Sequence, residues 1–212
     1  MIKLIVFNLY NTLIRIKKRN FFLNNLYRNS ECLQSKYNLK EFQHALLTSS
    51  LNLVIKSCSK LTINYYEKNY KNLEAELNSI VVIENVLQVL EILSKDYKIG
   101  LISNLATPYK KPFYNNRLSH YFDYLVFSCD VGLQKPDKNI FKKMEEMSDF
   151  EGAEILMIGD SFKSDYLGSQ NVGWRSLRII NGRKKKEKYD IESLEEIIGH
   201  PIFENEGGIY GI

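Results

Sequence analysis

The sequence predicts an α/β fold in which a parallel sheet carries an inserted group of helices. Short apolar segments alternate with helix-like segments along much of the chain, as expected for a parallel sheet with helices on both faces. All 11 glycines lie at or beyond Gly100, and the first proline is Pro108. Residues 14–95 therefore lack both strong helix breakers, which favours a long helical insertion.

Five segments are predicted to be strands because they are short, apolar and mostly rich in β-branched or aromatic residues. They are Lys3–Phe7, Lys98–Ile102, Tyr124–Ser128, Ile155–Ile158 and Ser176–Ile180. Sheets of this kind bind ligands at the carboxyl ends of their strands. Polar residues that follow the strands are therefore the candidates for a functional site.

Apolar periodicity predicts amphipathic helices in the glycine-free part of the chain. They are Phe21–Leu33, Leu39–Ser57, Ile63–Leu77 and Glu84–Lys95. We interpret the apolar stripe of the second helix as core packing; its members are Phe42, Leu46, Leu47, Leu51, Val54 and Ile55. Between or after the strands, helices are predicted at Tyr109–Leu118, Lys138–Met147, Ser164–Gln170 and Ile191–Ile198. We expect a solvated loop at Arg183–Lys188 and a loosely held tail at His200–Ile212.

The composition is that of a soluble protein with one compact domain and an insertion. The chain has 212 residues, of which 44% are hydrophobic and 25% charged. Its net charge of +4 is compatible with a small anionic substrate and does not require nucleic acid. Three cysteines without paired spacing, Cys32, Cys58 and Cys129, argue against a zinc site or a disulfide framework. With no signal peptide evident and only short apolar runs, we expect a cytoplasmic protein without a membrane partner.

The first candidate motif is the loop after the first strand, from Asn8 to Leu13. A phosphoryl-transfer loop needs a nucleophilic carboxylate, a hydroxyl to hold the transferred oxygens and a metal to neutralise charge. Thr12 suits the hydroxyl role, and Asn11 tolerates the left-handed backbone of a tight turn. Asn8 follows the strand directly, but a carboxamide oxygen cannot act as an anionic nucleophile. Taken alone, the loop is also compatible with an ordinary strand-to-turn junction.

Two further motifs follow later strands. Ser103 and Asn104 end an apolar strand, where a hydroxyl can donate to a phosphate oxygen, although such a pair ends many strands. The string Gly132–Asp137 is more specific. In it, Lys135 would project its ammonium group toward the ligand edge of the sheet, and Pro136 would lie near the first position of a helix.

The fourth motif runs from Ile158 to Gly168 and is the strongest. It places Asp160 and Asp165 after an apolar strand. Carboxylates at a strand end suit Mg²⁺, which keeps several waters and takes one or two carboxylates together with a substrate phosphate. The simpler alternative is an aspartate that caps a helix and a second aspartate in solvent.

In order and spacing, the four motifs resemble the signature of the haloacid dehalogenase-like (HAD) hydrolases, over residues 3–180. The resemblance implies a Rossmann-like parallel sheet whose five strands, numbered in chain order, are arranged 3-2-1-4-5. It also implies that residues 14–82 form an inserted helical C1 cap and that residues 1–13 and 83–212 form the core. Such a cap closes over the site and excludes water.

By position, the resemblance implies catalytic roles for three residues. Asn8 stands at the position of the nucleophile, and Tyr10 stands at the position of the general acid and base. Lys135 would balance the negative charge of the nucleophile and the phosphoryl group. The phosphate oxygens would be held by Thr12, Ser103, Asn104 and Lys135.

The resemblance also implies Mg²⁺ as the cofactor. The ion would be bound by Asn8, by the backbone carbonyl of Tyr10 and by Asp160. Asp165 would support Lys135 or bind the metal through a water molecule.

The chain departs from the family pattern at Asn8, where the family has the aspartate that forms an aspartyl-phosphate. An asparagine cannot form this intermediate, and the loss of one ligand charge should weaken Mg²⁺ binding. An engineered substrate-trapping variant, a natural pseudoenzyme and a recent natural loss would each explain it. Because the other site residues are all present, we favour a deliberate Asp→Asn change in an otherwise active enzyme.

The second departure is Tyr10, where phosphatases of the family usually have an aspartate. Free tyrosine has a pKa of about 10, which makes it a poor proton donor and acceptor at neutral pH. A tyrosine there resembles the 2-haloacid dehalogenase branch, which attacks carbon and uses no metal. That branch typically lacks the pattern Gly-Asp-Ser-x-x-x-Asp, so Asp160 and Asp165 favour Mg²⁺-dependent phosphoryl chemistry.

Three functional hypotheses follow. The first is a Mg²⁺-dependent phosphatase of a small phosphorylated metabolite, such as a sugar, triose or amino-alcohol phosphate, inactivated by Asn8. The second is a 2-haloacid dehalogenase-like hydrolase, which would release halide without a metal. The third is a natural pseudoenzyme that binds a phosphorylated ligand or a protein.

Overall fold

A six-stranded parallel sheet with the strand order β5-β4-β1-β6-β7-β8 forms the centre of the protein. The computed structural model describes residues 1–56, 58–182 and 187–203. The strands are β1 (Leu4–Phe7), β4 (Lys98–Ser103), β5 (Tyr124–Phe127), β6 (Ile155–Gly159), β7 (Arg175–Ile179) and β8 (Asp190–Ile191). The first five are the predicted strands, and their order confirms the predicted 3-2-1-4-5 arrangement.

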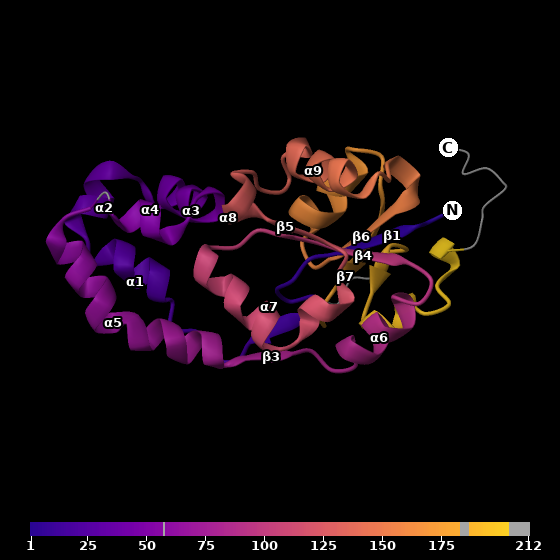
Figure 1. Cartoon of the computed structure of the whole chain (residues 1–212), viewed down its shortest axis with the longest axis horizontal. Coiled ribbons are helices and arrows are strands. Elements are labelled where there is room, and N and C mark those ends of the chain that lie inside the picture. The colour runs from indigo at the N-terminus through magenta and orange to yellow at the C-terminus, as the bar shows by residue number, and fades with distance from the viewer. Residues whose placement is uncertain (57, 183–186, 204–212) are drawn as a thin grey trace.

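The central strand β1 is buried on both of its faces. Its alternate residues enter two different clusters: Ile5 and Phe7 belong to one hydrophobic core, and Leu4 and Val6 belong to the other. A strand covered on both faces reads as a continuous apolar run, as this strand does. Helices α6 (Val86–Leu93), α7 (Lys111–Asn115) and α9 (Lys138–Ser148) lie on the two sides of the sheet (Figure 1). The short helices α8 (Ser128–Val131) and α10 (Gly168–Gln170) come after β5 and β6 in the chain.

Two of the helices predicted around the sheet have different bounds in the structure. The segment predicted as one helix from Tyr109 to Leu118 divides into the 3₁₀ turn Thr107–Lys110, helix α7 and the 3₁₀ turn Leu118–Tyr121, with a left-handed residue at Arg117. The helix predicted from Ser164 begins earlier, as a wide π-type turn at Phe162–Leu167 that continues into α10.

The predicted helix Ile191–Ile198 was wrong. Ile191 lies in the edge strand β8, and only Leu194–Ile197 forms a 3₁₀ turn. The cause is a long-range ion pair, because the Arg178 guanidinium of β7 donates to both carboxylate oxygens of Asp190 at 2.7 and 2.8 Å. Local periodicity carries no signal for this pairing.

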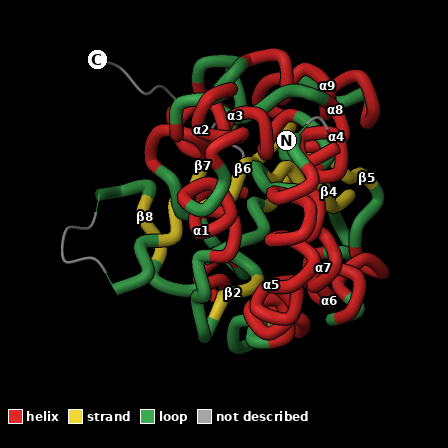
Figure 2. Tube along the Cα trace, turned by 90° about the vertical axis from the view of Figure 1, so that its left-hand side faces the viewer, coloured by secondary structure: helices red, strands yellow, loops and turns green. Residues whose placement is uncertain are grey.

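Five helices lie beside the sheet and form a lobe of their own, coloured indigo to magenta in Figure 1. They are α1 (Phe22–Arg28), α2 (Glu31–Lys36), α3 (Leu39–Thr48), α4 (Leu51–Lys56) and α5 (Lys60–Asn78). The chain enters and leaves the lobe through an antiparallel pair, β2 (Ile14–Ile16) and β3 (Ile80–Val82), which sequence reasoning missed. Figure 2 shows β2 below the main sheet and beside α5.

The lobe contains more helix ends than the periodicity predicts. The predicted helix Phe21–Leu33 breaks at Asn29, and the Ser30 hydroxyl caps α2 by accepting from the Leu33 N–H. The predicted helix Leu39–Ser57 breaks at Ser49, whose backbone is extended. Serine caps favour such breaks without glycine or proline. Ser57 itself lies outside the described residues.

The predicted apolar stripe packs as a core with one exception. Phe42, Leu46, Leu51, Val54 and Ile55 belong to the lobe's hydrophobic cluster, whereas Leu47 is only half-buried and lines a cavity. No helix within the described part of the chain is long and apolar enough to cross a membrane. The expectations for residues 183–186 and 204–212 fall outside the described residues.

Candidate active site

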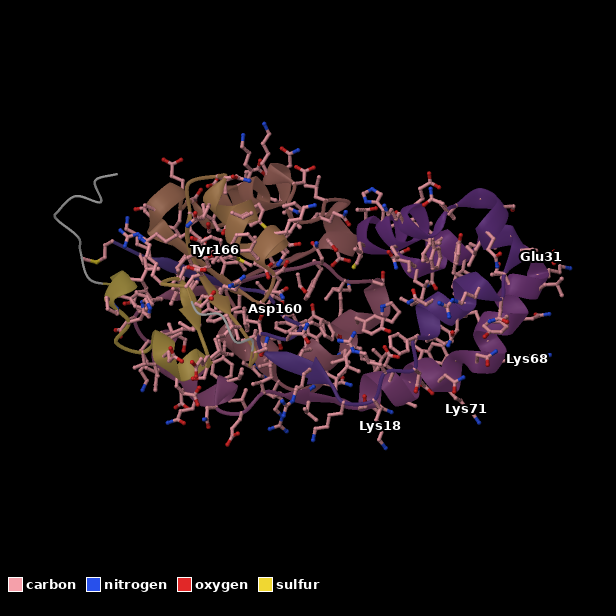
Figure 3. The ribbon with its side chains drawn as sticks, turned by 180° about the vertical axis from the view of Figure 1, so that it is seen from behind. Lys18, Glu31, Lys68, Lys71, Asp160 and Tyr166 are labelled. Atoms are coloured by element: carbon pink, nitrogen blue, oxygen red, sulfur yellow. The ribbon has the colours of Figure 1, made fainter. Side chains whose placement is uncertain are left out.

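Four polar side chains meet at the carboxyl ends of three adjacent strands. Asn8 follows β1, Ser103 ends β4 and Asp160 follows β6, while Lys135 reaches in from the loop before α9. The register places the last residue of β1, Phe7, opposite Leu101 of β4 and Ile158 of β6. Parallel strands in this register bring their following residues together, as the sequence predicts. Figure 3 shows Asp160 near the middle of the molecule, where the sheet approaches the helical lobe.

The carboxamide of Asn8 uses both of its polar atoms in this cluster. Its Oδ1 accepts from the Lys135 Nζ at 3.2 Å and, at the outer limit of hydrogen bonding, from the Ser103 Oγ at 3.5 Å. Its Nδ2 donates to the backbone carbonyl of Tyr10 at 2.9 Å and to the Asp160 Oδ1 at 3.0 Å. If the Asn8 amide were flipped, its N–H would point at the Lys135 ammonium group. The hydrogen-bond partners of Asn8 therefore determine the orientation of its amide.

Lys135 is buried and has three partners. Its Nζ donates to the Asp165 Oδ1 at 2.6 Å, to the Ile102 carbonyl at 2.7 Å and to Asn8. The Asn104 side chain holds the Lys135 backbone from both sides, since its Nδ2 donates to the Lys135 carbonyl and its Oδ1 accepts from the Lys135 N–H, both at 2.8 Å. The structure therefore gives Asn104 a contact that positions Lys135.

The sequence predicts that Pro136 lies near the first position of a helix, and the structure contradicts this. Helix α9 begins at Lys138, and Asp137 caps it by accepting from the Asn139 N–H at 2.9 Å. The Asp137 carboxylate accepts a hydrogen bond from an N–H of the first helical turn. Proline has no side-chain acceptor and cannot cap the helix in this way, so the helix starts after the aspartate.

Asp165 is 2% exposed and lies behind Lys135. Its Oδ1 forms the ion pair with Lys135, and its Oδ2 accepts from the Ser161 N–H at 2.9 Å. Asp165 is expected either to support Lys135 or to bind a metal through a water molecule. This geometry matches the first role. The carboxyl lies against Gly159, where a Cβ atom would come within 2.3 Å of the Asp165 Oδ2.

Replacing Gly159 with alanine is expected to displace Asp165 and lower the free energy of unfolding by about 3 kcal/mol. Equilibrium urea unfolding measures the change. The control is Gly182→Ala, where an added Cβ meets nothing within 4 Å and φ is +77°. That variant should lose only about 1 kcal/mol through backbone strain. Equal losses in the two variants would contradict the predicted collision.

Thr12 lies in the loop after β1, and its hydroxyl faces no hydrogen-bond partner among the described residues. It is 1% exposed. Asn11 adopts the predicted left-handed backbone with φ of 59°. Its Nδ2 donates to the Asp160 Oδ2 at 3.2 Å. Thr12 lines a different cavity, together with Arg15, Asn85 and Asn181, and its hydroxyl forms no hydrogen bond to Asn8, Ser103 or Lys135.

Asp160 and the Tyr10 carbonyl offer oxygen atoms of the kind that Mg²⁺ prefers. In this chain, however, the Asn8 amide directs N–H groups at both of them. Burial, and then the charge of Asp165, raise the pKa of the Asp160 carboxyl. The donor set with Asn8 therefore does not fit Mg²⁺.

Tyr10 directs its phenol away from this cluster. The hydroxyl donates to the backbone carbonyl of Tyr109 at 2.9 Å. Burial, and then the charge of Glu76, raise the pKa of Tyr10 further above its usual value. Tyr10 is thus a still weaker proton donor than the sequence suggested.

A cavity of about 400 Å³ is lined by Tyr10 and Asn104, whose hydrogen bonds to Asn8 and Lys135 connect it to the polar cluster. The helical lobe supplies much of its wall. Sequence reasoning did not find Glu76 and Tyr109, two of its polar residues, because nothing in the local pattern of α5 or of the Thr107–Lys110 turn separates a cavity wall from a solvent face. The other lining residues are Ile16, Arg19, Phe21, Leu23, Asn24, Gln43, Leu46, Leu47, Leu105 and Ala106.

Comparison with known proteins identifies the family. The family model described as haloacid dehalogenase-like hydrolase matches residues 5–179. The chain belongs to this family. As a HAD-like hydrolase, it resembles the HAD family enzyme BT-2542 of Bacteroides thetaiotaomicron, solved with magnesium and inorganic phosphate. The two share 19% identity with a TM-score of 0.65, over 87% of this chain and 97% of that one.

Curated HAD-like relatives match over shorter stretches. A pyrimidine 5′-nucleotidase of Escherichia coli is 33% identical over 106 residues, which are 47% of this chain and 47% of the relative. A glyceraldehyde 3-phosphate phosphatase of Methanothermobacter thermautotrophicus is 28% identical over 105 residues, or 49% of this chain and 46% of the relative. The chain thus spans about half the length of these two relatives.

Proposed function

We propose that this HAD-like hydrolase has the binding site of a phosphatase for small phosphate monoesters, in which Asn8 allows binding but prevents turnover. The buried Lys135 ammonium group carries the proposal, because it is held by Asp165 and aimed at the residue that follows β1. The Ser103 hydroxyl, at the end of β4, donates to the same Asn8 oxygen. A preorganised cation and a hydroxyl donor suit a phosphoryl group.

The proposal assigns a role to each group. Lys135 and Ser103 bind the phosphoryl oxygens beside Asn8, and the cavity holds the alcohol part of the ester. Residues 14–82 act as a cap that excludes water. The Asn8 carboxamide occupies the place of the attacking group but carries no negative charge, so no bond to phosphorus forms. The relatives that are named as a phosphatase and a nucleotidase support phosphate monoesters as the ligand class.

An aspartate at position 8 would change both functions of the side chain. Its carboxylate would attack phosphorus, release the alcohol and form an aspartyl-phosphate that water then hydrolyses. It would also replace the N–H groups that face Tyr10 and Asp160 with an oxygen ligand. We therefore expect Mg²⁺ dependence in the aspartate form, as the complex of BT-2542 with magnesium suggests.

The binding proposal is tested on the unmodified chain by calorimetric titration with inorganic phosphate in the presence of EDTA. We expect saturable binding at one site. A Lys135→Met variant that retains full affinity, or the absence of binding by the unmodified chain, would overturn the proposal.

A metal titration tests the effect of Asn8 separately. Saturating Mg²⁺ should leave the Tm of the unmodified chain within about 1 °C, and it should raise the Tm of the Asn8→Asp variant by about 5 °C at a hundred-fold excess over Kd. Differential scanning calorimetry measures both values. The exposed Asn115 provides a control, because Asn115→Asp adds the same charge away from the site. An equal rise in the Tm of the unmodified chain would show that the Asn8 amide does not oppose Mg²⁺ binding.

The 2-haloacid dehalogenase hypothesis has one specific observation in its favour, which is Tyr10 itself. The half-buried Asp160 argues against it, since attack on carbon has no evident use for this carboxylate, whereas Asp165, which holds Lys135, fits either reaction. It predicts halide release by the Asn8→Asp variant that EDTA does not affect.

A further inference from the structure

Glu76 is a buried carboxylate in the wall of the cavity. It lies in the last turns of α5 and is 4% exposed. Its Oε1 accepts from the Tyr109 hydroxyl at 2.7 Å, and its Oε2 accepts from the Asn20 N–H at 2.6 Å. The two oxygens of a carboxylate offer about four lone-pair sites, so each retains capacity toward the cavity.

Both partners of Glu76 are neutral. Among the described residues, no lysine, arginine or histidine forms an ion pair with it. Arg19 lines the same cavity, but it is exposed and forms no such pair. Lys68 and Lys71 of α5 project outward on the far side of the helix (Figure 3). A buried carboxylate is normally paired with a cation, because burial without one is costly.

The charge of Glu76 acts on its surroundings. Burial is the main cause of the raised pKa of Tyr109, the hydrogen bond to Glu76 and its charge add to it, and the charge of Arg19 opposes it. The same charge contributes to the raised pKa of Tyr10. A second negative group near Glu76 is therefore disfavoured, and a cation is favoured.

The rest of the cavity indicates the shape of a ligand that would supply this cation. Its wall between the polar cluster and Glu76 is largely apolar, with Phe21, Leu23, Leu46, Leu47 and Leu105 among the lining residues. Tyr10 and Asn104 connect the cavity to the residues around Asn8. A ligand with a phosphate at one end and a short aliphatic chain would extend toward α5.

We propose that the ligand is an aminoalkyl phosphate monoester, whose ammonium group is bound by Glu76 while its phosphate is bound at Asn8, Ser103 and Lys135. This inference rests on the phosphate site proposed above. An ammonium group supplies up to three donors together with the missing positive charge. A hydroxyl at the same place would donate a hydrogen bond but leave the carboxylate uncompensated.

The test is calorimetric titration of the unmodified chain with three probes: inorganic phosphate, butyl phosphate and 3-aminopropyl phosphate. The two esters match in length, and an ammonium group replaces a methyl group. We expect the amino ester to bind about ten-fold or more tightly than the butyl ester, as a charge-assisted contact allows. Equal affinities, or a preference for the butyl ester, would overturn the proposal. This comparison needs no variant, so it does not depend on how a substitution folds.

Two variants then assign the preference to a residue. Glu76→Gln should abolish the preference for the amino ester and leave the affinity for inorganic phosphate unchanged. Glu67→Gln, in an exposed position of the same helix, should change neither. Equal weakening of both esters by Glu76→Gln would mean that Glu76 only holds α5 to Tyr109, and the proposal fails. If inorganic phosphate and both esters all fail to bind, the phosphate site itself is refuted; if all three bind without preference, only the role of Glu76 is refuted.

Discussion

The Asn8→Asp variant is expected to release phosphate from small phosphate monoesters when Mg²⁺ is present. Its rate should exceed that of the unmodified chain by at least about 10⁴-fold, the scale on which enzymes lose activity when a nucleophile is removed. The reason is chemical, because only the carboxylate can form an acyl phosphate. Lys135 already contacts the side-chain oxygen at position 8 and is held by Asp165. Colorimetric phosphate release over a panel of sugar, triose and aminoalkyl phosphates measures the rate.

The controls of this experiment separate the three hypotheses for the chain. Asn115→Asp should remain as inactive as the unmodified chain, and EDTA should abolish the activity of Asn8→Asp. Halide release from 2-haloacids that persists in EDTA would replace the phosphatase by a dehalogenase. An Asn8→Asp variant that binds phosphate but is silent with every substrate would identify a binding protein.

Lys135→Met is expected to cause the largest loss of stability, about 3–5 kcal/mol in the free energy of unfolding. The side chains of Lys135 and Asp165 are 1% and 2% exposed. Removing the ammonium group leaves the Asp165 carboxylate buried without its counterion, and the Ile102 carbonyl loses a donor. Equilibrium urea unfolding at neutral pH measures the loss.

A matched control comes from the neighbouring helix α9. Lys143 pairs with Glu146, and the two side chains are 44% and 66% exposed, so Lys143→Met should cost at most about 0.5 kcal/mol. Adding Asp165→Asn to Lys135→Met should restore most of the stability, because it removes the unpaired charge and keeps an acceptor for the Ser161 N–H. If the double variant is as unstable as the single one, lost packing rather than the unpaired carboxylate explains the effect.

The predicted residues that the structure brings together at the sheet edge share a local signal. Asn8, Ser103 and Asp160 each come at the end of an apolar strand, and parallel strands bring their carboxyl ends to one edge. Lys135 was found through the unusual string around it. The fold of the core followed from the same alternation of apolar segments and helices.

The parts that it missed depend on contacts between distant residues. Ile191 lies in a strand rather than a helix because its neighbour Asp190 pairs with Arg178, and Asn104 holds the Lys135 backbone across 31 positions. The breaks in the helical lobe occur at serine caps, which compete with an otherwise continuous helical pattern.

By itself, the sequence determined the family of the protein and the absence of a carboxylate at position 8, and the family resemblance implied the order of the five main strands. Only the tertiary structure decided what Asn8 does in place of that carboxylate. Its amide contacts both Lys135 and Asp160, and Asp160 lies 152 positions from Asn8 in the chain. It alone also placed Glu76 in a cavity beside this cluster. The physical reason is that apolar periodicity reports burial along one segment, whereas hydrogen bonds and charge pairs depend on which segments pack together.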